Sequence, residues 1–69
     1  MRIKDLREDN DYTQKQIADY LHIKQNTYSQ YETQKRDLPI SVLIKLARLY
    51  NTSTDFILGL TDEKKPYKR

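Results

Sequence analysis

The chain has 69 residues, of which 36% are hydrophobic and 33% charged, and this length leaves room for one small domain rather than for a large catalytic cleft. A formal net charge of +3 and a pI near 9.2 favour an acidic partner only mildly. The absence of cysteine excludes disulfides, thiolate metal sites and cysteine nucleophiles, and no apolar run reaches the length of a membrane span. We therefore expect a cytoplasmic protein without a membrane segment.

Two helices are predicted in the first third of the chain. The first runs from about residue 2 to residue 8 and is carried by Ile3 and Leu6, with a polar turn after it. The second begins at Thr13, whose hydroxyl can accept from the amide three residues on while Gln16 reaches back to the Thr13 amide. This capping box fixes where the second helix starts.

The second helix has one apolar face and ends in a tight turn. Ile17 and Leu21 stand one turn apart on that face, and Ala18 beside them is small enough to let another helix approach closely. A short connection is expected at His22 and Ile23. Two short helices meeting at a steep angle would bury these apolar residues.

A third helix is predicted from about Gln25 to about Glu32, with Tyr28 and Tyr31 on its inner face. Its other face carries uncharged hydrogen-bonding side chains, namely Gln25, Asn26, Ser29 and Gln30. An ordinary solvated helix would carry Glu and Lys pairs there, whereas Gln and Asn suit adenine edges in the major groove. Lys24, Lys35 and Arg36 flank the helix and suit phosphates. A polar solvated face without a ligand is the alternative.

The last two helices are predicted from an apolar stripe and from two caps. Pro39 or Ile40 begins the fourth helix, whose stripe consists of Leu43, Ile44, Leu46, Ala47 and Tyr50. Ser53 caps a short fifth helix and Gly59 ends it. Residues 1–61 then form the domain, and residues 62–69 form a charged flexible tail.

Over this length the chain resembles the helix-turn-helix DNA-binding proteins of the phage Cro and repressor type, also called the Xre family. The similarity runs from about Ile3 to Thr61 and is strongest over TQKQIADYLHIKQNTYSQYE and LPISVLIKLARLYNTSTDFILGLTD. The resemblance implies an all-α, five-helix, lambda-repressor-like domain in which the second and third helices form the helix-turn-helix.

The resemblance also implies roles for individual residues. The five buried positions of the motif correspond to Ile17, Leu21, Ile23, Tyr28 and Tyr31. Its base-reading positions correspond to Gln25, Asn26, Ser29 and Gln30, and its usual phosphate contacts to Thr13, Gln14, Thr27, Thr33 and Lys35. Arg7 and Glu32 match positions that often form an ion pair beside the DNA backbone, and such a pair would aim Arg7 at a phosphate.

The sequence departs from the family pattern in both turns of the motif. His22 stands where the family commonly has the glycine of the turn, and Thr33 with Gln34 replaces an Asn-Gly pair after the third helix. A residue other than glycine is expected to strain a left-handed turn. The Thr33 phosphate contact depends on how that second loop is folded.

Other candidate sites are weaker. His22 has no second ligand near it for a metal, and a triad of Ser29, His22 and Asp19 would lack an oxyanion hole. The six tyrosines could suggest stacking on single-stranded nucleic acid, but Tyr28, Tyr31 and Tyr50 fall on core faces. No catalytic residue, cofactor, metal or small-molecule ligand is therefore expected.

The sequence as a whole favours a transcriptional regulator, acting as a repressor, that binds double-stranded DNA as a homodimer on a palindromic operator. The expected dimer surface is the fifth helix and the residues directly after it, through Phe56, Leu58 and Leu60. The main alternative is a protein-interaction module of the same fold, such as an antitoxin or an anti-repressor partner. A small nucleic-acid enzyme is a third class, opposed by the lack of a carboxylate cluster for metal ions.

Overall fold

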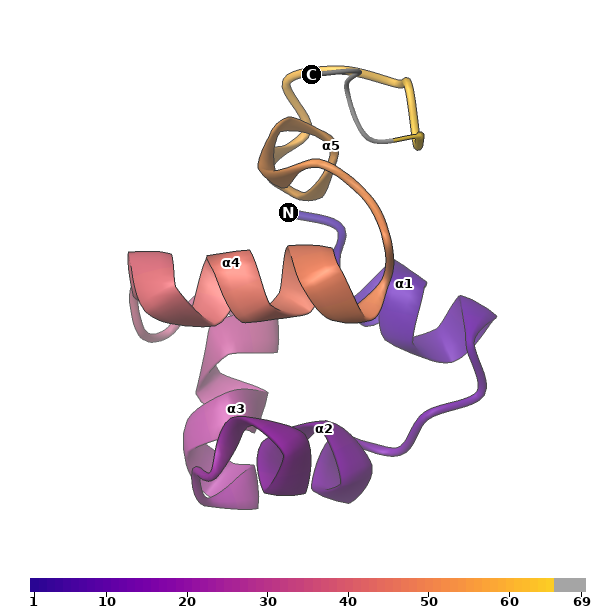
Figure 1. Cartoon of the computed structure of the whole chain (residues 1–69). Helices are drawn as coiled ribbons and strands as arrows, with labels where there is room; N and C mark the ends of the chain where they lie inside the picture. The colour runs from indigo at the N-terminus through magenta and orange to yellow at the C-terminus, as the bar shows by residue number, and fades with distance from the viewer. Residues whose placement is uncertain (66–69) are drawn as a thin grey trace.

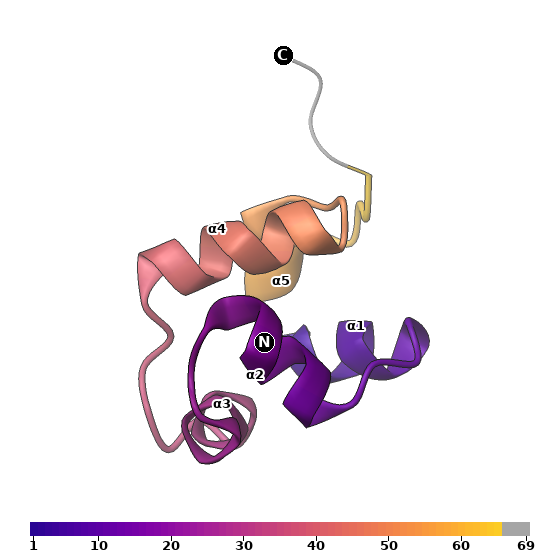
Figure 2. The same ribbon diagram turned by 60° about the horizontal axis from the view of Figure 1, so that its bottom comes forward.

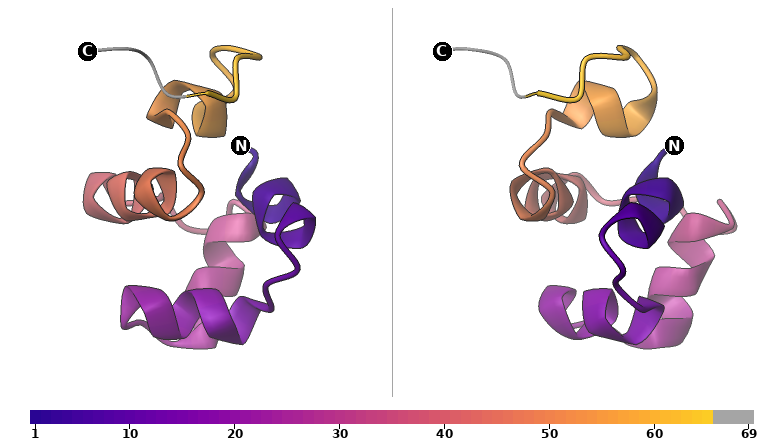
Figure 3. Two further views of the ribbon diagram at one scale, coloured as in Figure 1. Left: turned by 45° about the vertical axis from the view of Figure 1, so that its right-hand side comes forward. Right: turned by 90° about the vertical axis from the view of Figure 1, so that its right-hand side faces the viewer.

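The computed structural model describes residues 1–65, and these form an all-α domain of five helices. The helices are α1 (Ile3–Asp9), α2 (Gln14–Leu21), α3 (Gln25–Glu32), α4 (Ile40–Leu49) and α5 (Thr54–Leu58). In Figure 1, α2 and α3 cross steeply at one end of the molecule, and Figure 2 looks nearly along α3. The α5 helix lies at the opposite end, beside the N-terminus (Figure 3). The predicted fold class is confirmed.

Two helices start at side-chain caps that the sequence predicts. The Thr13 hydroxyl accepts from the Gln16 amide (3.1 Å), and the Gln16 side chain accepts from the Thr13 amide (2.8 Å). The Ser53 hydroxyl accepts from the Phe56 amide (3.0 Å) at the start of α5. Each cap satisfies amides that have no partner inside the first helical turn, so the start of the helix is fixed locally.

Each of the five helices in residues 1–65 is followed within two residues by a residue with positive φ, although the chain has a single glycine. These residues are Asp11, His22, Gln34, Asn51 and Gly59. At each end, the left-handed residue and the next one return their amides to carbonyls of the last helical turn, as His22 does to Asp19 (3.2 Å) and Ile23 to Ala18 (3.0 Å). His22 is therefore one of four positions in residues 1–65 at which a residue other than glycine adopts this strained left-handed conformation.

The core gathers one face of every helix. Its buried hydrophobic members are Ile3, Leu6, Ile17, Ala18, Leu21, Tyr28, Tyr31, Val42, Leu46, Ala47, Tyr50, Phe56 and Ile57. Four of the five predicted buried positions of the motif are buried, and the fifth, Ile23, is half-buried against the core. Helices α2 and α3 thus share a continuous apolar contact that holds the angle between them.

The predicted stripe of α4 is wrong in one respect. Val42 is buried and Ile44 is exposed, whereas the prediction placed Ile44 in the stripe and omitted Val42. Apolar residues occupy positions 42, 43, 44, 46 and 47 in succession, so periodicity alone does not show which of them face inward.

The N-terminus packs against α5 and the segment after it. The Arg2 amide donates to the Ile57 carbonyl (2.8 Å), and the Arg2 guanidinium lies over the Phe56 ring, 4.3 Å from its centroid. The guanidinium also pairs with Asp62 (2.9 Å), and the Thr52 hydroxyl donates to the Lys64 carbonyl. Residues 62–65, predicted as part of a flexible tail, therefore contact the domain, while residues 66–69 of that prediction lie outside the described part of the chain.

Candidate nucleic-acid interface

The α3 helix presents one buried face and one polar face. Tyr28 is 0% exposed and Tyr31 is also buried, as predicted. On the other side Gln25 and Asn26 are exposed, and Ser29 and Gln30 are half-buried. The four predicted base-reading residues therefore share the outer side of a helix that lies at the edge of the molecule (Figure 1).

A largely buried ion pair ties α1 to α3. Arg7 donates from Nε to Oε2 of Glu32 (2.7 Å) and from Nη2 to Oε1 (3.2 Å), and its Nη1 donates to the Tyr12 carbonyl (3.0 Å). The two side chains are only 13% and 3% exposed. The structure covers most of both side chains, so removing one partner would leave the other charge with little access to water.

Gln14 joins the same cluster from the first turn of α2. Its Nε2 donates to Oε1 of Glu32 (3.0 Å), so the Glu32 carboxylate receives hydrogen bonds from two other helices. The interaction joins residues 18 positions apart, and no local sequence pattern indicates it. Gln14, a predicted phosphate contact, is thereby fixed relative to the outer face of α3.

The surroundings of Glu32 act on its protonation in opposite directions. Burial by itself would raise the pKa of Glu32, but hydrogen bonds from Arg7 and Gln14 and the neighbouring Tyr28 hydroxyl more than offset it, and the net pKa is lowered. Burial raises the pKa of the Tyr28 and Tyr50 hydroxyls, for which no hydrogen-bond partner lies within bonding distance among residues 1–65. Glu32 is therefore the ionised centre of this cluster at neutral pH.

The predicted phosphate contacts differ in how free their side chains are. Lys24 and Lys35 are exposed and make no ion pair with any residue up to 65. Thr27 is half-buried, the Thr13 hydroxyl serves as a cap, and the Thr33 hydroxyl donates back to the Ser29 carbonyl (3.1 Å). Arg36 is exposed, and its Nε donates to Oε1 of Gln30 (2.9 Å), an interaction that the sequence does not predict.

Arg7 has less access to a phosphate than predicted. Three of its N–H groups are engaged by Glu32 and the Tyr12 carbonyl, and its side chain is 13% exposed. The other two of its five N–H groups have no partner among residues 1–65, but the low exposure of the side chain leaves them little room to meet an external anion. The geometry favours a role in holding α1, α2 and α3 together.

The predicted dimer residues are not equally available. Phe56 is buried beneath Arg2, so the prediction that it offers surface is wrong, because the sequence does not show that the N-terminus returns to cover this ring. Leu58 and Leu60 are exposed, and so are Ile40 and Ile44 on the neighbouring α4. Exposed apolar side chains are therefore found on α4 as well as on and after α5.

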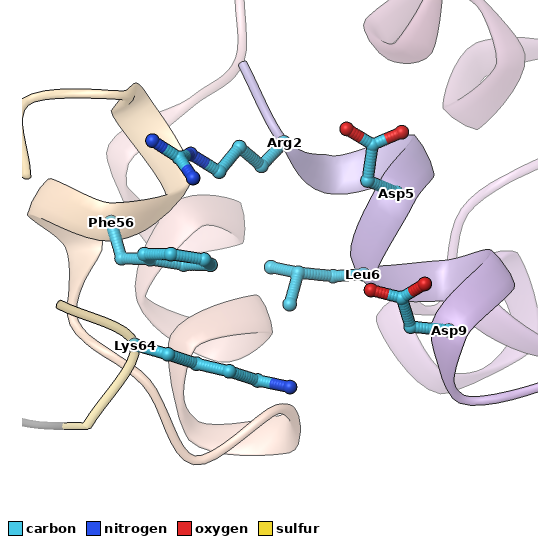
Figure 4. A pocket seen from close by; sticks show the side chains of 6 residues that line it. All are labelled: Arg2, Asp5, Leu6, Asp9, Phe56 and Lys64. Carbon is cyan, nitrogen blue, oxygen red and sulfur yellow. The ribbon is translucent and has the colours of Figure 1, made fainter. Parts of the chain in front are cut away.

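Other regions carry little that resembles a catalytic or metal site. Within residues 1–65 no group of three His, Asp or Glu side chains could hold a metal ion, and no helix is long and apolar enough to cross a membrane. A small pocket between α1 and α5 has Leu6 and Phe56 on its walls and the carboxylates of Asp5 and Asp9 near its rim (Figure 4). The pocket is also lined by Arg2 and Lys64, so positive and negative side chains both surround its apolar walls.

Comparison with known proteins agrees with this architecture. The family model described as helix-turn-helix matches residues 3–57. The chain is 44% identical over 64 residues to the HTH-type transcriptional regulator ImmR of Bacillus subtilis, covering 93% of this chain and 50% of that protein. It is 40% identical over 65 residues to YobD of the same organism, named as an uncharacterized HTH-type transcriptional regulator, and the match covers 94% of this chain and 58% of that one.

A third relative is YonR of Bacillus subtilis, named as an SPbeta prophage-derived uncharacterized HTH-type transcriptional regulator. It is 37% identical over 57 residues, which cover 83% of this chain and 53% of that protein. The chain thus spans about half the length of these curated relatives. No solved structure gives a significant match. The family match and the predicted motif residues cover the same helices, and the chain belongs to the helix-turn-helix family of the phage Cro and repressor type.

Proposed function

We propose that this chain is a sequence-specific double-stranded DNA-binding transcriptional regulator that reads the major groove with α3. The observation that carries the proposal is the outer face of α3, where Gln25 and Asn26 are exposed amides on a helix at the edge of the molecule. An amide can bond two atoms of one base edge at once, and the major groove is wide enough to admit a helix. The three relatives described above are named as HTH-type transcriptional regulators, two of them as uncharacterized ones, which supports the same function.

Phosphate contacts would set the position of α3 in the groove. Lys24 lies at the N-terminal end of α3 and Lys35 beyond its C-terminal end, so the two cations flank the amide face. Gln14 and Thr13, at the start of α2, supply the polar groups on the far side of the turn. Contacts of this kind fix register without carrying sequence information, which is left to the amides. The proposal assigns the chain no reaction.

A homodimer on a palindromic operator would supply the contacts that one short helix lacks. Its surface would use Leu58 and Leu60, extended by Ile40 and Ile44, because Ile40 is 75% and Leu60 73% exposed. Exposed apolar side chains on neighbouring helices favour burial against another protein surface. Such a dimer would repress transcription where it occupies a promoter. The protein would act in the cytoplasm, where the DNA lies.

The same apolar surface favours a second candidate, a protein-interaction module such as an antitoxin or an anti-repressor partner. The two functions use different faces of the domain. In the second, α4 and α5 would contact a protein while the outer face of α3 would stay solvated. They are separable by experiment.

The test is to select preferred duplexes from a random pool and then to measure the affinity of Gln25→Ala and Lys35→Ala for the selected site and for its single-base variants. We expect Gln25→Ala to relax the preference at one base pair per half-site, by about 1 to 3 kcal/mol of discrimination. Lys35→Ala should weaken binding to all sequences alike. A chain that selects no sequence, or Gln25→Ala with an unchanged preference and an intact fold, would favour the protein-interaction module.

A further inference from the structure

After α3 a turn leads the chain back to the C-terminal end of the polar face of α3. Gln34 has φ of +61°, its amide donates to the Tyr31 carbonyl (3.2 Å), and the Lys35 amide donates to the Gln30 carbonyl (3.0 Å). This pair of bonds reverses the chain direction after the last helical turn. Arg36, six residues after Gln30, is thereby placed beside it, and its Nε donates to Oε1 of Gln30 (2.9 Å).

The chemistry of the guanidinium fixes the orientation of the Gln30 amide. Arginine carries only donors, so the amide atom that faces it must be the carbonyl oxygen. The Gln30 Nε2 then points away from Arg36 with both hydrogens unused by residues 1–65, and Nη1 and Nη2 of Arg36 are likewise without a partner among these residues. The two side chains together present donors to whatever lies against this end of α3.

This arrangement differs from the one that reads adenine. Bidentate recognition of adenine needs the amide oxygen to accept from N6 while the nitrogen donates to N7, but here the oxygen is already held by Arg36. Guanine offers two acceptors, N7 and O6, and no donor at the same edge. A surface that presents donors matches guanine and mismatches adenine.

We propose that Gln30 and Arg36 form one specificity-determining pair that selects guanine at the base pair facing the C-terminal end of α3. The proposal rests on the DNA-binding function and assigns Arg36 to base recognition, where the sequence predicts a phosphate contact. The hydrogen bond from Arg36 Nε to Gln30 Oε1 restricts the orientation of both the guanidinium and the side-chain amide. Both side chains lie on the solvent side of the turn, Arg36 exposed and Gln30 half-buried, so the pair is accessible to a base edge.

The test uses duplexes selected with the wild-type chain and four variants, Gln30→Ala, Arg36→Ala, Arg36→Lys and the double Gln30→Ala/Arg36→Ala. Each affinity is measured for the selected site and for the four possible bases at every position. We expect Gln30→Ala and Arg36→Ala to lose about tenfold of guanine preference at the same base pair, and the double variant to lose little more than either single one. Arg36→Lys keeps the charge but not the planar fork, so it should lose guanine preference as well.

Lys35→Ala is the matched control, since it removes a neighbouring exposed cation that has no side-chain partner among residues 1–65. It should weaken binding uniformly and leave the base preference unchanged. The proposed role of the pair is overturned if Arg36→Ala behaves like Lys35→Ala, or if Arg36→Lys retains full guanine preference. It is also overturned if Gln30→Ala changes the preference at a base pair that contains no selected guanine. A wild-type chain that selects no sequence would overturn the DNA-binding function itself, which distinguishes the two failures.

Discussion

Replacing Glu32 by Gln should destabilise the domain strongly, because the carboxylate is the shared acceptor of α1 and α2. The substitution keeps the shape of the side chain and one acceptor oxygen, but it leaves the buried Arg7 guanidinium without a counter-charge. Removing one partner of a fully buried ion pair costs about 3 to 5 kcal/mol, and both the partial exposure of Arg7 and the retained oxygen place the expected loss at the lower end, about 3 kcal/mol. A chain of this length has only about 3 to 10 kcal/mol of stability.

The assay is urea unfolding followed by helical circular dichroism, with Glu8→Gln as the control because Glu8 is an exposed glutamate on α1. Glu8→Gln should stay within about 0.5 kcal/mol of the wild-type chain. The double variant Arg7→Met/Glu32→Leu should recover most of the lost stability, since apolar residues of similar volume replace the pair. The assigned role of the buried pair is refuted if Glu32→Gln is as stable as Glu8→Gln, or if the double variant is no better than the single one.

The pH dependence of stability provides a second readout of the same residue. The folded-state pKa of Glu32 is lowered from its ordinary value of 4.5, so the unfolded chain binds more protons in the window below that value. The stabilisation is fully present above the ordinary pKa and is lost as pH falls through the folded-state pKa. Glu32→Gln should lack this part of the acid dependence, whereas Glu8→Gln should keep it.

Four further outcomes are expected. Gln34→Gly should raise the free energy of unfolding by up to about 1 kcal/mol, because Gln34 holds φ of +61° and glycine adopts it freely; calorimetry showing a loss would contradict this. Thr13→Ala should lower the free energy by about 1 kcal/mol in urea unfolding, and an unchanged midpoint would show that the cap is dispensable. Leu60→Asp should weaken dimerisation in sedimentation equilibrium without loss of helicity, and an unchanged dimer would place the interface elsewhere. Affinity for the selected duplex should fall by about 0.9 log unit per log unit of salt for each phosphate neutralised, so a flat salt dependence would oppose DNA binding.

Much of the fold is predictable because helix ends are set by local chemistry. The capping box at Thr13 and the cap at Ser53 involve residues three apart, and both begin helices where the sequence predicts them. The inner face of α3 is predictable in the same way from Tyr28 and Tyr31. The bounds of α3 match the prediction, while α1 runs from Ile3 to Asp9, shifted by about one residue.

The contacts that the sequence does not predict join residues far apart or depend on the path of a turn. Phe56 is covered by Arg2, 54 positions away, and Gln14 reaches Glu32 across a turn and most of a helix. The burial of the Arg7 ion pair likewise depends on how three helices converge. Arg36 meets Gln30 only because Gln34 adopts a left-handed conformation that composition alone does not require.

Contact between DNA and the outer face of α3 can be observed by nuclear magnetic resonance of the chain with its selected duplex. The side-chain amide signals of Gln25 and Asn26 report on that face, and those of Asn51, which is exposed beyond the end of α4, serve as a reference. At saturation we predict that the Gln25 and Asn26 signals shift or gain protection from exchange while the Asn51 signals do not. Unchanged Gln25 and Asn26 signals on a saturated duplex would contradict the proposed role of this face.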